Sequence, residues 1–187
     1  MKNYFLLLFS IVAMSQLSTY AQAPPDSVLN KYHPGSSREK YKAIDSYLNS
    51  FYKNDSLLIK KSLELIAYFK KQNDYSGVDY ANVCLANRAA RDKHDYTTAL
   101  NIALPILSAF KTRNDTTGIQ MVTFIIDFCY ETTKNYAEAI KYEKELIPIY
   151  LARGDKKGLS DNYNEIGAIY AQAFLPDSGL VYAQQAL

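Results

Sequence analysis

The stretch FKTRNDTTGI at residues 110–119 occurs in two related forms, FKKQNDYSGV at 69–78 and YLARGDKKGL at 150–159. Each copy begins with an aromatic residue, has Asn or Gly fifth and Asp sixth, and closes on Gly and an aliphatic residue. The glycines of the three copies recur at steps of 41 and 40 residues, at Gly77, Gly118 and Gly158. A fixed period of this length predicts a repeat architecture.

The residues of this stretch are those that end one helix and begin the next. In the middle copy Arg113 suits the negative end of a helix dipole, and Asn114 tolerates a left-handed helix stop. Asp115 can then accept a hydrogen bond from the next helix as its N-cap. The corresponding residues are Gln72, Asn73 and Asp74 in the first copy, and Arg153, Gly154 and Asp155 in the last.

Glycine recurs in the first turn of each new helix, where it costs roughly 1 kcal/mol against alanine. A cost that recurs three times suggests that the backbone is packed closely there. We therefore expect Gly77, Gly118 and Gly158 to contact the preceding repeat.

Amphipathic periodicity between these stretches predicts an all-α fold of eight helices in four antiparallel pairs. Pro105 and Pro148 fall inside two of them and are expected to cause kinks. The expected helices are residues 38–52, 56–70, 78–91, 96–111, 119–132, 136–152, 159–174 and 178 onward.

The first residues have the features of a targeting segment. Lys2 precedes a short apolar run, residues 4–14, which is too short for a normal membrane span. Small residues follow, so we expect a secretory signal peptide at 1–21, cleaved after Ala21, and a linker at 22–37. An uncleaved anchor is the alternative. The chain is therefore expected to be exported, and to be periplasmic or membrane-associated through a segment beyond Leu187.

The two cysteines, Cys84 and Cys129, lie in apolar helical contexts at different offsets within their repeats. Export permits a disulfide between them. Buried thiols that pack as small hydrophobic groups are the favoured interpretation.

Composition and motifs argue against catalysis and nucleic-acid binding. The net charge is +2 and no basic run interleaves with aromatic residues, so no electrostatic footprint for nucleic acid is present. Glycine-rich phosphate loops, nucleophile elbows and paired metal ligands are absent from the sequence, and His33 and His94 are isolated. The recurring aspartates could form a cation ladder, but capping explains them. We expect no catalytic, cofactor or metal residues and no enzyme activity in this chain.

The fourth repeat shows which family the chain resembles. Its helices read NYNEIGAIY at 162–170 and GLVYAQQAL at 179–187. They are similar to the tetratricopeptide repeat (TPR), in a variety with a period of about 40 residues rather than 34. The matching positions are Tyr163, Ile166, Gly167, Tyr170, Gly179, Ala183 and Ala186. Asp127 in the third repeat and Asp45 in the first depart from the family pattern, which has small residues there.

The resemblance covers residues 38–187 and implies an α-solenoid with a right-handed superhelix. It also implies a groove lined by the first helix of each pair. The candidate groove residues are Tyr80, Val83, Asn87, Met121, Phe124, Phe128, Asp161 and Asn164. Phe124 and Phe128 share one helix face, and a core role for both is slightly favoured. The paired Lys and Asn residues with which the family clamps a peptide carboxylate are not seen here.

These features favour an exported scaffold that binds a protein or peptide. The alternative is an input region of a membrane-bound histidine kinase or helix-turn-helix regulator, and a structural part of an export or polysaccharide-uptake assembly is a third interpretation. The closing aromatic of the fourth repeat is expected near position ~190. We therefore expect a fragment of a longer array, unstable or self-associating alone, that exposes Leu180, Ala183 and Leu187.

Overall fold

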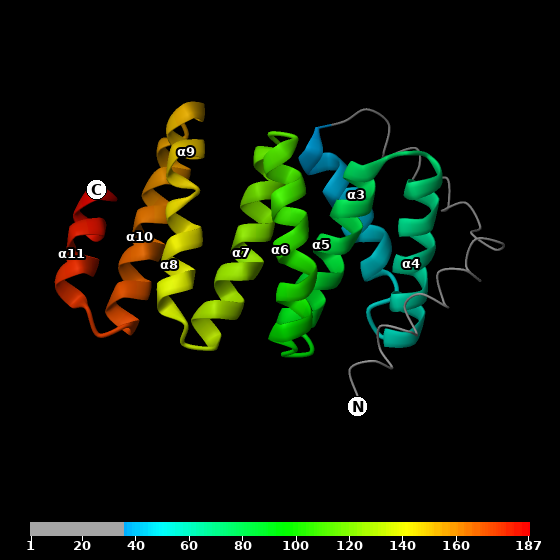
Figure 1. Ribbon diagram of the computed structural model, residues 1–187, viewed down its shortest axis with the longest axis horizontal. Helices are drawn as coiled ribbons and strands as arrows, with labels where there is room; N and C mark the ends of the chain where they lie inside the picture. The colour runs from blue at the N-terminus through cyan, green and yellow to red at the C-terminus, as the bar shows by residue number, and fades with distance from the viewer. Residues whose placement is uncertain (1–35) are drawn as a thin grey trace. The chain divides into compact units, whose positions relative to one another are not determined.

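The computed structural model describes residues 36–187, in which every regular element is an α-helix. The expected signal peptide, 1–21, and nearly all of the expected linker lie outside these residues. The helices are α3 (Ser37–Asn49), α4 (Asp55–Lys71), α5 (Tyr75–Arg91), α6 (Tyr96–Thr112), α7 (Thr116–Thr132), α8 (Tyr136–Lys144), α9 (Ile147–Arg153), α10 (Lys156–Gln172) and α11 (Pro176–Gln185) (Figure 1). The all-α prediction is therefore confirmed for this part of the chain. None of these helices is long and apolar enough to cross a membrane.

Left-handed residues end the helices at regular intervals. They precede the next helix by two residues and are spaced 20 or 21 residues apart, at Asn73, His94, Asn114, Lys134, Gly154 and Phe174. The predicted stops at Asn73, Asn114 and Gly154 are confirmed. The same geometry also closes the turns within the second, third and fourth helix pairs, at His94, Lys134 and Phe174, so the half-repeat is regular from α4 onward.

The predicted N-caps are confirmed as well. Asp74, Asp115 and Asp155 accept hydrogen bonds from the amides of Gly77, Gly118 and Gly158 at 2.9, 3.1 and 2.9 Å. Because these caps fix the first helical residue, α5, α7 and α10 begin at Tyr75, Thr116 and Lys156, three residues earlier than expected.

Two of the three recurring glycines, Gly118 and Gly158, are required by the aromatic residue of their own stretch. A Cβ on Gly118 would clash with the ring of Phe110, and a Cβ on Gly158 would clash with the ring of Tyr150. Close backbone packing was expected at these glycines, and the structure shows that each packs against the aromatic side chain eight residues earlier. The first and ninth residues of the repeated stretch are therefore in direct contact across the turn.

The two prolines act differently. α6 continues through Pro105, whereas the helix expected at 136–152 divides into α8 and α9 just before Pro148. Pro148 has no amide hydrogen to bond the carbonyl of Lys144, which accounts for a break at this point.

The chain divides into two compact units within α5, between Cys84 and Leu85. In the first unit α3 packs on α4, and the core includes Ile44, Leu65 and Phe69.

Both cysteines are free, so the interpretation as unpaired thiols is confirmed. Cys129 is buried and Cys84 is half-buried.

In the second unit α6 packs on α7, α7 on α8, α8 and α9 on α10, and α10 on α11. Its core includes Phe110, Ile126 and Ile166, all with no exposed surface. α10 and α11 approach most closely at two glycines: a Cβ on Gly179 would lie 2.8 Å from the carbonyl oxygen of Gly167. This contact explains why both positions lack a side chain.

Candidate functional site

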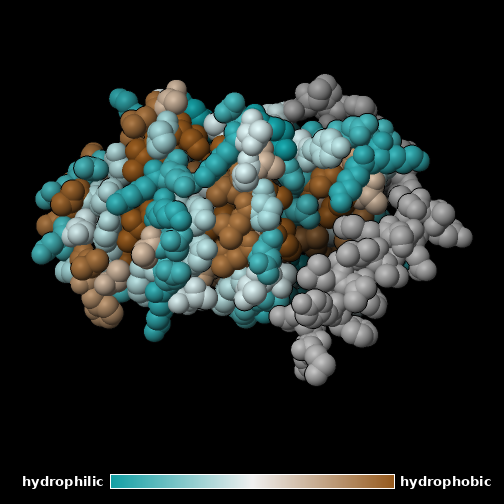
Figure 2. Space-filling model, in the orientation of Figure 1, coloured by the Kyte–Doolittle hydropathy of each residue, from teal (hydrophilic) through white to brown (hydrophobic). Residues whose placement is uncertain are grey.

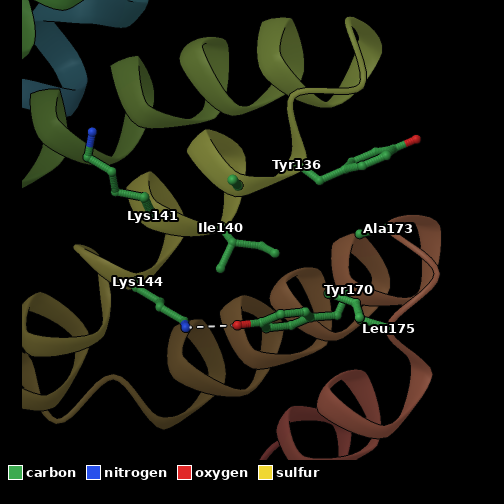
Figure 3. Close-up of a pocket in the computed structure, with 8 residues that line it drawn as sticks. Tyr136, Ile140, Lys141, Lys144, Tyr170, Ala173 and Leu175 are labelled. Carbon is green, nitrogen blue, oxygen red and sulfur yellow. Dashed lines mark hydrogen bonds between the residues drawn. The ribbon is translucent and has the colours of Figure 1, made fainter.

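A cavity of about 630 Å³ lies in the second unit, between α8 and the C-terminal half of α10. Figure 3 shows its two walls, with α8 on one side and Tyr170 and the α10–α11 turn on the other. The lining residues are Tyr136, Ala137, Ile140, Lys141, Lys144, Tyr170, Ala173 and Leu175.

One wall follows from helical spacing. Tyr136, Ile140 and Lys144 are four residues apart and share one face of α8. The buried part of this face packs on Ile166 and Ile169 of α10, and Tyr136 and Tyr170 are packed against the same cluster. The cavity therefore opens directly beside the core of the second unit, which holds its walls in place.

Lys144 places a positive charge against two tyrosines. Its Nζ donates a hydrogen bond of 3.0 Å to the Tyr170 hydroxyl (Figure 3) and lies 5.3 and 5.2 Å from the ring centres of Tyr170 and Tyr182. The two rings stack with centres 5.6 Å apart. The hydrogen bond to Tyr170 raises the pKa of Lys144, so the ammonium remains charged at neutral pH.

A second cation stands at the edge of the cavity. Lys141 is exposed and forms an ion pair of 2.8 Å with Glu138. A surface pair of this kind contributes little to stability, so Lys141 can exchange Glu138 for another carboxylate. The eight lining residues include no carboxylate, thiol or imidazole. This chemistry suits binding of an apolar group that carries an adjacent negative charge.

Only some of the residues predicted for the groove are exposed to solvent. Tyr80 and Val83 have 0% and 1% of their surface exposed, so the prediction of a groove role for them is corrected: both belong to the core of the first unit. The Tyr80 ring lies 6.0 Å from that of Tyr41, which helps to cover it. Asn87, Met121 and Phe128 are half-buried, whereas Phe124, Asp161 and Asn164 are exposed.

Phe124 and Phe128 do lie together, as their spacing predicts. The favoured core role is wrong for Phe124, which is 56% exposed. The guanidinium of Arg91 lies 4.8 Å from the Phe124 ring centre and 4.4 Å from that of Phe128. Arg91 shields the rings by cation–π contact, which sequence reasoning did not anticipate. On α10, Asp161 pairs with Lys157 at 2.5 Å and takes no part in this cluster.

Apolar side chains are also exposed at α11 and the turn before it. Figure 2 shows hydrophobic patches on the surface of the segment that Figure 1 labels α11. The exposed residues include Phe174, Leu175, Leu180, Val181 and Leu187. The predicted exposure of Leu180, Ala183 and Leu187 is confirmed.

Sequence reasoning missed the cavity, because none of its lining residues was among the predicted groove residues. The spacing of Tyr136, Ile140 and Lys144 was a signal for one wall, but the second wall depends on how α10 packs. No protein-family model, curated protein or solved structure matches this chain. A function therefore has to be argued from the chemistry of the site itself.

Proposed function

We propose that this chain is an exported, non-enzymatic scaffold of the tetratricopeptide type that binds a segment of another protein. In this proposal the helix pairs form an α-solenoid with a right-handed superhelix. Its support is the 20-residue spacing of the helix stops and the 40-residue spacing of the capped turns. Proteins built in this way expose long surfaces on which extended peptides dock.

The cavity beside α8 and α10 is the observation that carries the proposal. Its volume, about 630 Å³, lies in the range in which pockets hold ligands. We assign its apolar floor, formed around Ile140 and Ala173, to an apolar side chain of the partner. Lys144 and Lys141 then attract a carboxylate close to that side chain, because charge-assisted hydrogen bonds are the stronger ones.

The experiment is selection of peptides on the immobilised full chain, followed by affinity measurement on matched variants. Leu175→Glu introduces a carboxylate at the cavity, where Leu175 is 53% exposed. Ile59→Glu is the control, since Ile59 is 51% exposed but lies on α4 in the first unit. Neither substitution removes a buried side chain, so both variants are expected to fold.

We expect the selected peptides to combine apolar and acidic residues and to lose about 10-fold or more in affinity on Leu175→Glu, which corresponds to roughly 1.4 kcal/mol. Ile59→Glu should leave their affinity unchanged. Equal losses in both variants, or peptides without acidic residues, would remove the cavity as the binding site.

A further inference from the structure

Four carboxylates meet where α7, α8 and α10 pack together. Asp127 and Glu131 come from α7, Glu143 from α8 and Glu165 from α10. One carboxylate oxygen from each of Asp127, Glu131 and Glu165 lies within 4.8 Å of the other two. We call these three residues the acidic triad.

The triad and its neighbour Glu143 have no basic partner among the described residues. Within residues 36–187 no lysine or arginine forms an ion pair with any of the four carboxylates. Because buried charges without a partner are costly, a cation bound among these carboxylates would stabilise their charged forms.

Some buried oxygens also lack hydrogen-bond partners in the region where α7, α8 and α10 pack together. We call this region, which contains Asp127, Glu131, Glu143 and Glu165, the seam. Asp127 is only 2% exposed, and its Oδ1 receives no hydrogen bond although it belongs to the triad. Thr123, one helical turn before Asp127, is fully buried with an unpartnered hydroxyl. The Oδ1 of Asn162, one turn before Glu165, is unpartnered too.

The hydrogen bonds that do form leave these oxygens unsatisfied. Asn162 Nδ2 donates to Glu143 Oε2 at 2.5 Å and to the Glu143 carbonyl at 3.1 Å. Gln172 Nε2 donates to Glu131 Oε1. Both amide groups have thus used donors on Glu143 and Glu131, and none of the described residues donates to Oδ1 of Asp127. Buried polar atoms in native proteins are almost always satisfied, so an unpaired acceptor inside an acidic cluster points to a bound cation.

We propose that Asp127, Glu131 and Glu165 bind a divalent cation, with Ca²⁺ preferred. The ligand set is entirely oxygen, which suits a hard cation rather than a thiophilic or imidazole-bound metal. Ca²⁺ accepts several protein carboxylates in a flexible geometry, whereas Mg²⁺ demands a nearly ideal octahedron and usually keeps several waters. A ligand set made of three side-chain carboxylates therefore favours Ca²⁺.

The site has a path for the ion. Asp127 is buried, Glu131 is half-buried and Glu165 is exposed, so the triad leads from solvent into the seam. The unpartnered oxygens of Thr123 and Asn162 belong to buried residues one helical turn before Asp127 and Glu165. A cation held here links α7 to α10 and removes the repulsion between them. The site is separate from the cavity and independent of peptide binding.

The test combines thermal melting with terbium luminescence on the full chain. Tb³⁺ substitutes for Ca²⁺, and its emission is sensitised by nearby tyrosines such as Tyr130, the neighbour of Glu131. We expect Ca²⁺ at about 100 times its Kd to raise the melting temperature by about 5–10 °C over the protein in EDTA. Mg²⁺ at the same concentration should raise it less.

Two variants and a control separate a built site from general attraction of cations. Asp127→Asn and Glu165→Gln should weaken Tb³⁺ binding about 10-fold or more and remove the Ca²⁺-induced rise in melting temperature. Asp161→Asn alters an exposed carboxylate of the same helix α10 and should change neither measurement. The proposal is overturned if Ca²⁺ leaves the melting temperature unchanged, or if all three variants bind Tb³⁺ as well as the original chain does.

Discussion

Asp115 and Asp127 lie twelve residues apart, at the start and in the body of α7. Their carboxylates differ in whether the protein satisfies them with hydrogen bonds. Asp115 caps α7 by accepting the amide of Gly118 at 3.1 Å. Asp127 is buried, and its Oδ1 has no donor. The cap explains the first carboxylate, whereas Oδ1 of the second has no hydrogen-bond partner among residues 36–187.

The regions around the two residues differ in the same way. At the turn, Phe110 is fully buried against Gly118, so apolar packing and hydrogen bonding support each other. In the seam, Glu131, Glu143 and Glu165 add to the repulsion at Asp127. The turn therefore stabilises the fold, whereas the clustered carboxylates of the seam are typical of a cation-binding site.

The largest expected effect is on the packing of the turn. Phe110→Ala removes a ring with no exposed surface and should lower the free energy of unfolding by about 3–5 kcal/mol. Phe124→Ala, at a ring that is 56% exposed, should cost about 1 kcal/mol or less. Chemical denaturation of both variants measures the difference. Equal losses would mean that the turn is no more tightly packed than the exposed face of α7.

The carboxylates of the seam should make the folded protein less stable as pH rises, whereas an ordinary ion-paired carboxylate makes it more stable. In EDTA, the folded pKa values of Asp127 and Glu143, about 7 and about 8, lie above the unfolded values of roughly 4. Between these values the folded protein binds more protons than the unfolded protein does, so stability falls as pH rises from about 4 to about 8 and levels off above that. The slope is at most about 1.4 kcal/mol per pH unit for each group.

Urea denaturation at pH 6.0, 7.0 and 8.5 measures this dependence, with Asp127→Asn as the variant that should flatten it. Stability that is constant or increases over this range would show that the seam carboxylates are neutralised in some other way.

A smaller effect is expected from filling the glycine contact. Gly118→Ala forces the Phe110 ring to move and should cost about 1–3 kcal/mol. Adding Phe110→Leu should cost less in this background than in the original chain, because the clash is partly relieved. A double-mutant cycle gives this coupling energy, and strict additivity would show that the two residues do not touch.

The smallest effect belongs to the cap. Asp115→Ala should lower the free energy of unfolding by about 1 kcal/mol through loss of one helix-capping bond. Affinity for cavity-binding peptides should not change. Loss of peptide affinity at unchanged stability would give Asp115 a binding role that the structure does not indicate.

The turns could be predicted because their determinants are local. Asn114, Asp115 and Gly118 specify a stop, a cap and a close contact within five residues, and the structure contains all three. The division of one helix before Pro148 was expected only as a kink, since propensity does not show whether a proline bends a helix or ends it.

The cavity and the seam could not be predicted in the same way, because each brings α10 together with helices that are not adjacent to it in the chain. One signal was present: Asp127 replaces the small residue expected from the family resemblance, as does Asp45. Asp45 is half-buried and accepts a hydrogen bond from the Cys84 thiol at 3.9 Å. Only the structure shows that Asp45 has a partner in its unit, whereas Asp127 faces other carboxylates.

The most direct test of the contrast between Asp115 and Asp127 is thermal melting of two variants in EDTA. Asp115→Ala should melt at a lower temperature than the original chain, because it loses a satisfied cap. Asp127→Asn should melt at a higher temperature, because an amide removes one buried negative charge and can donate to neighbouring carboxylates. A lower melting temperature for both variants would contradict the account, since Asp127 would then be a structural residue like Asp115.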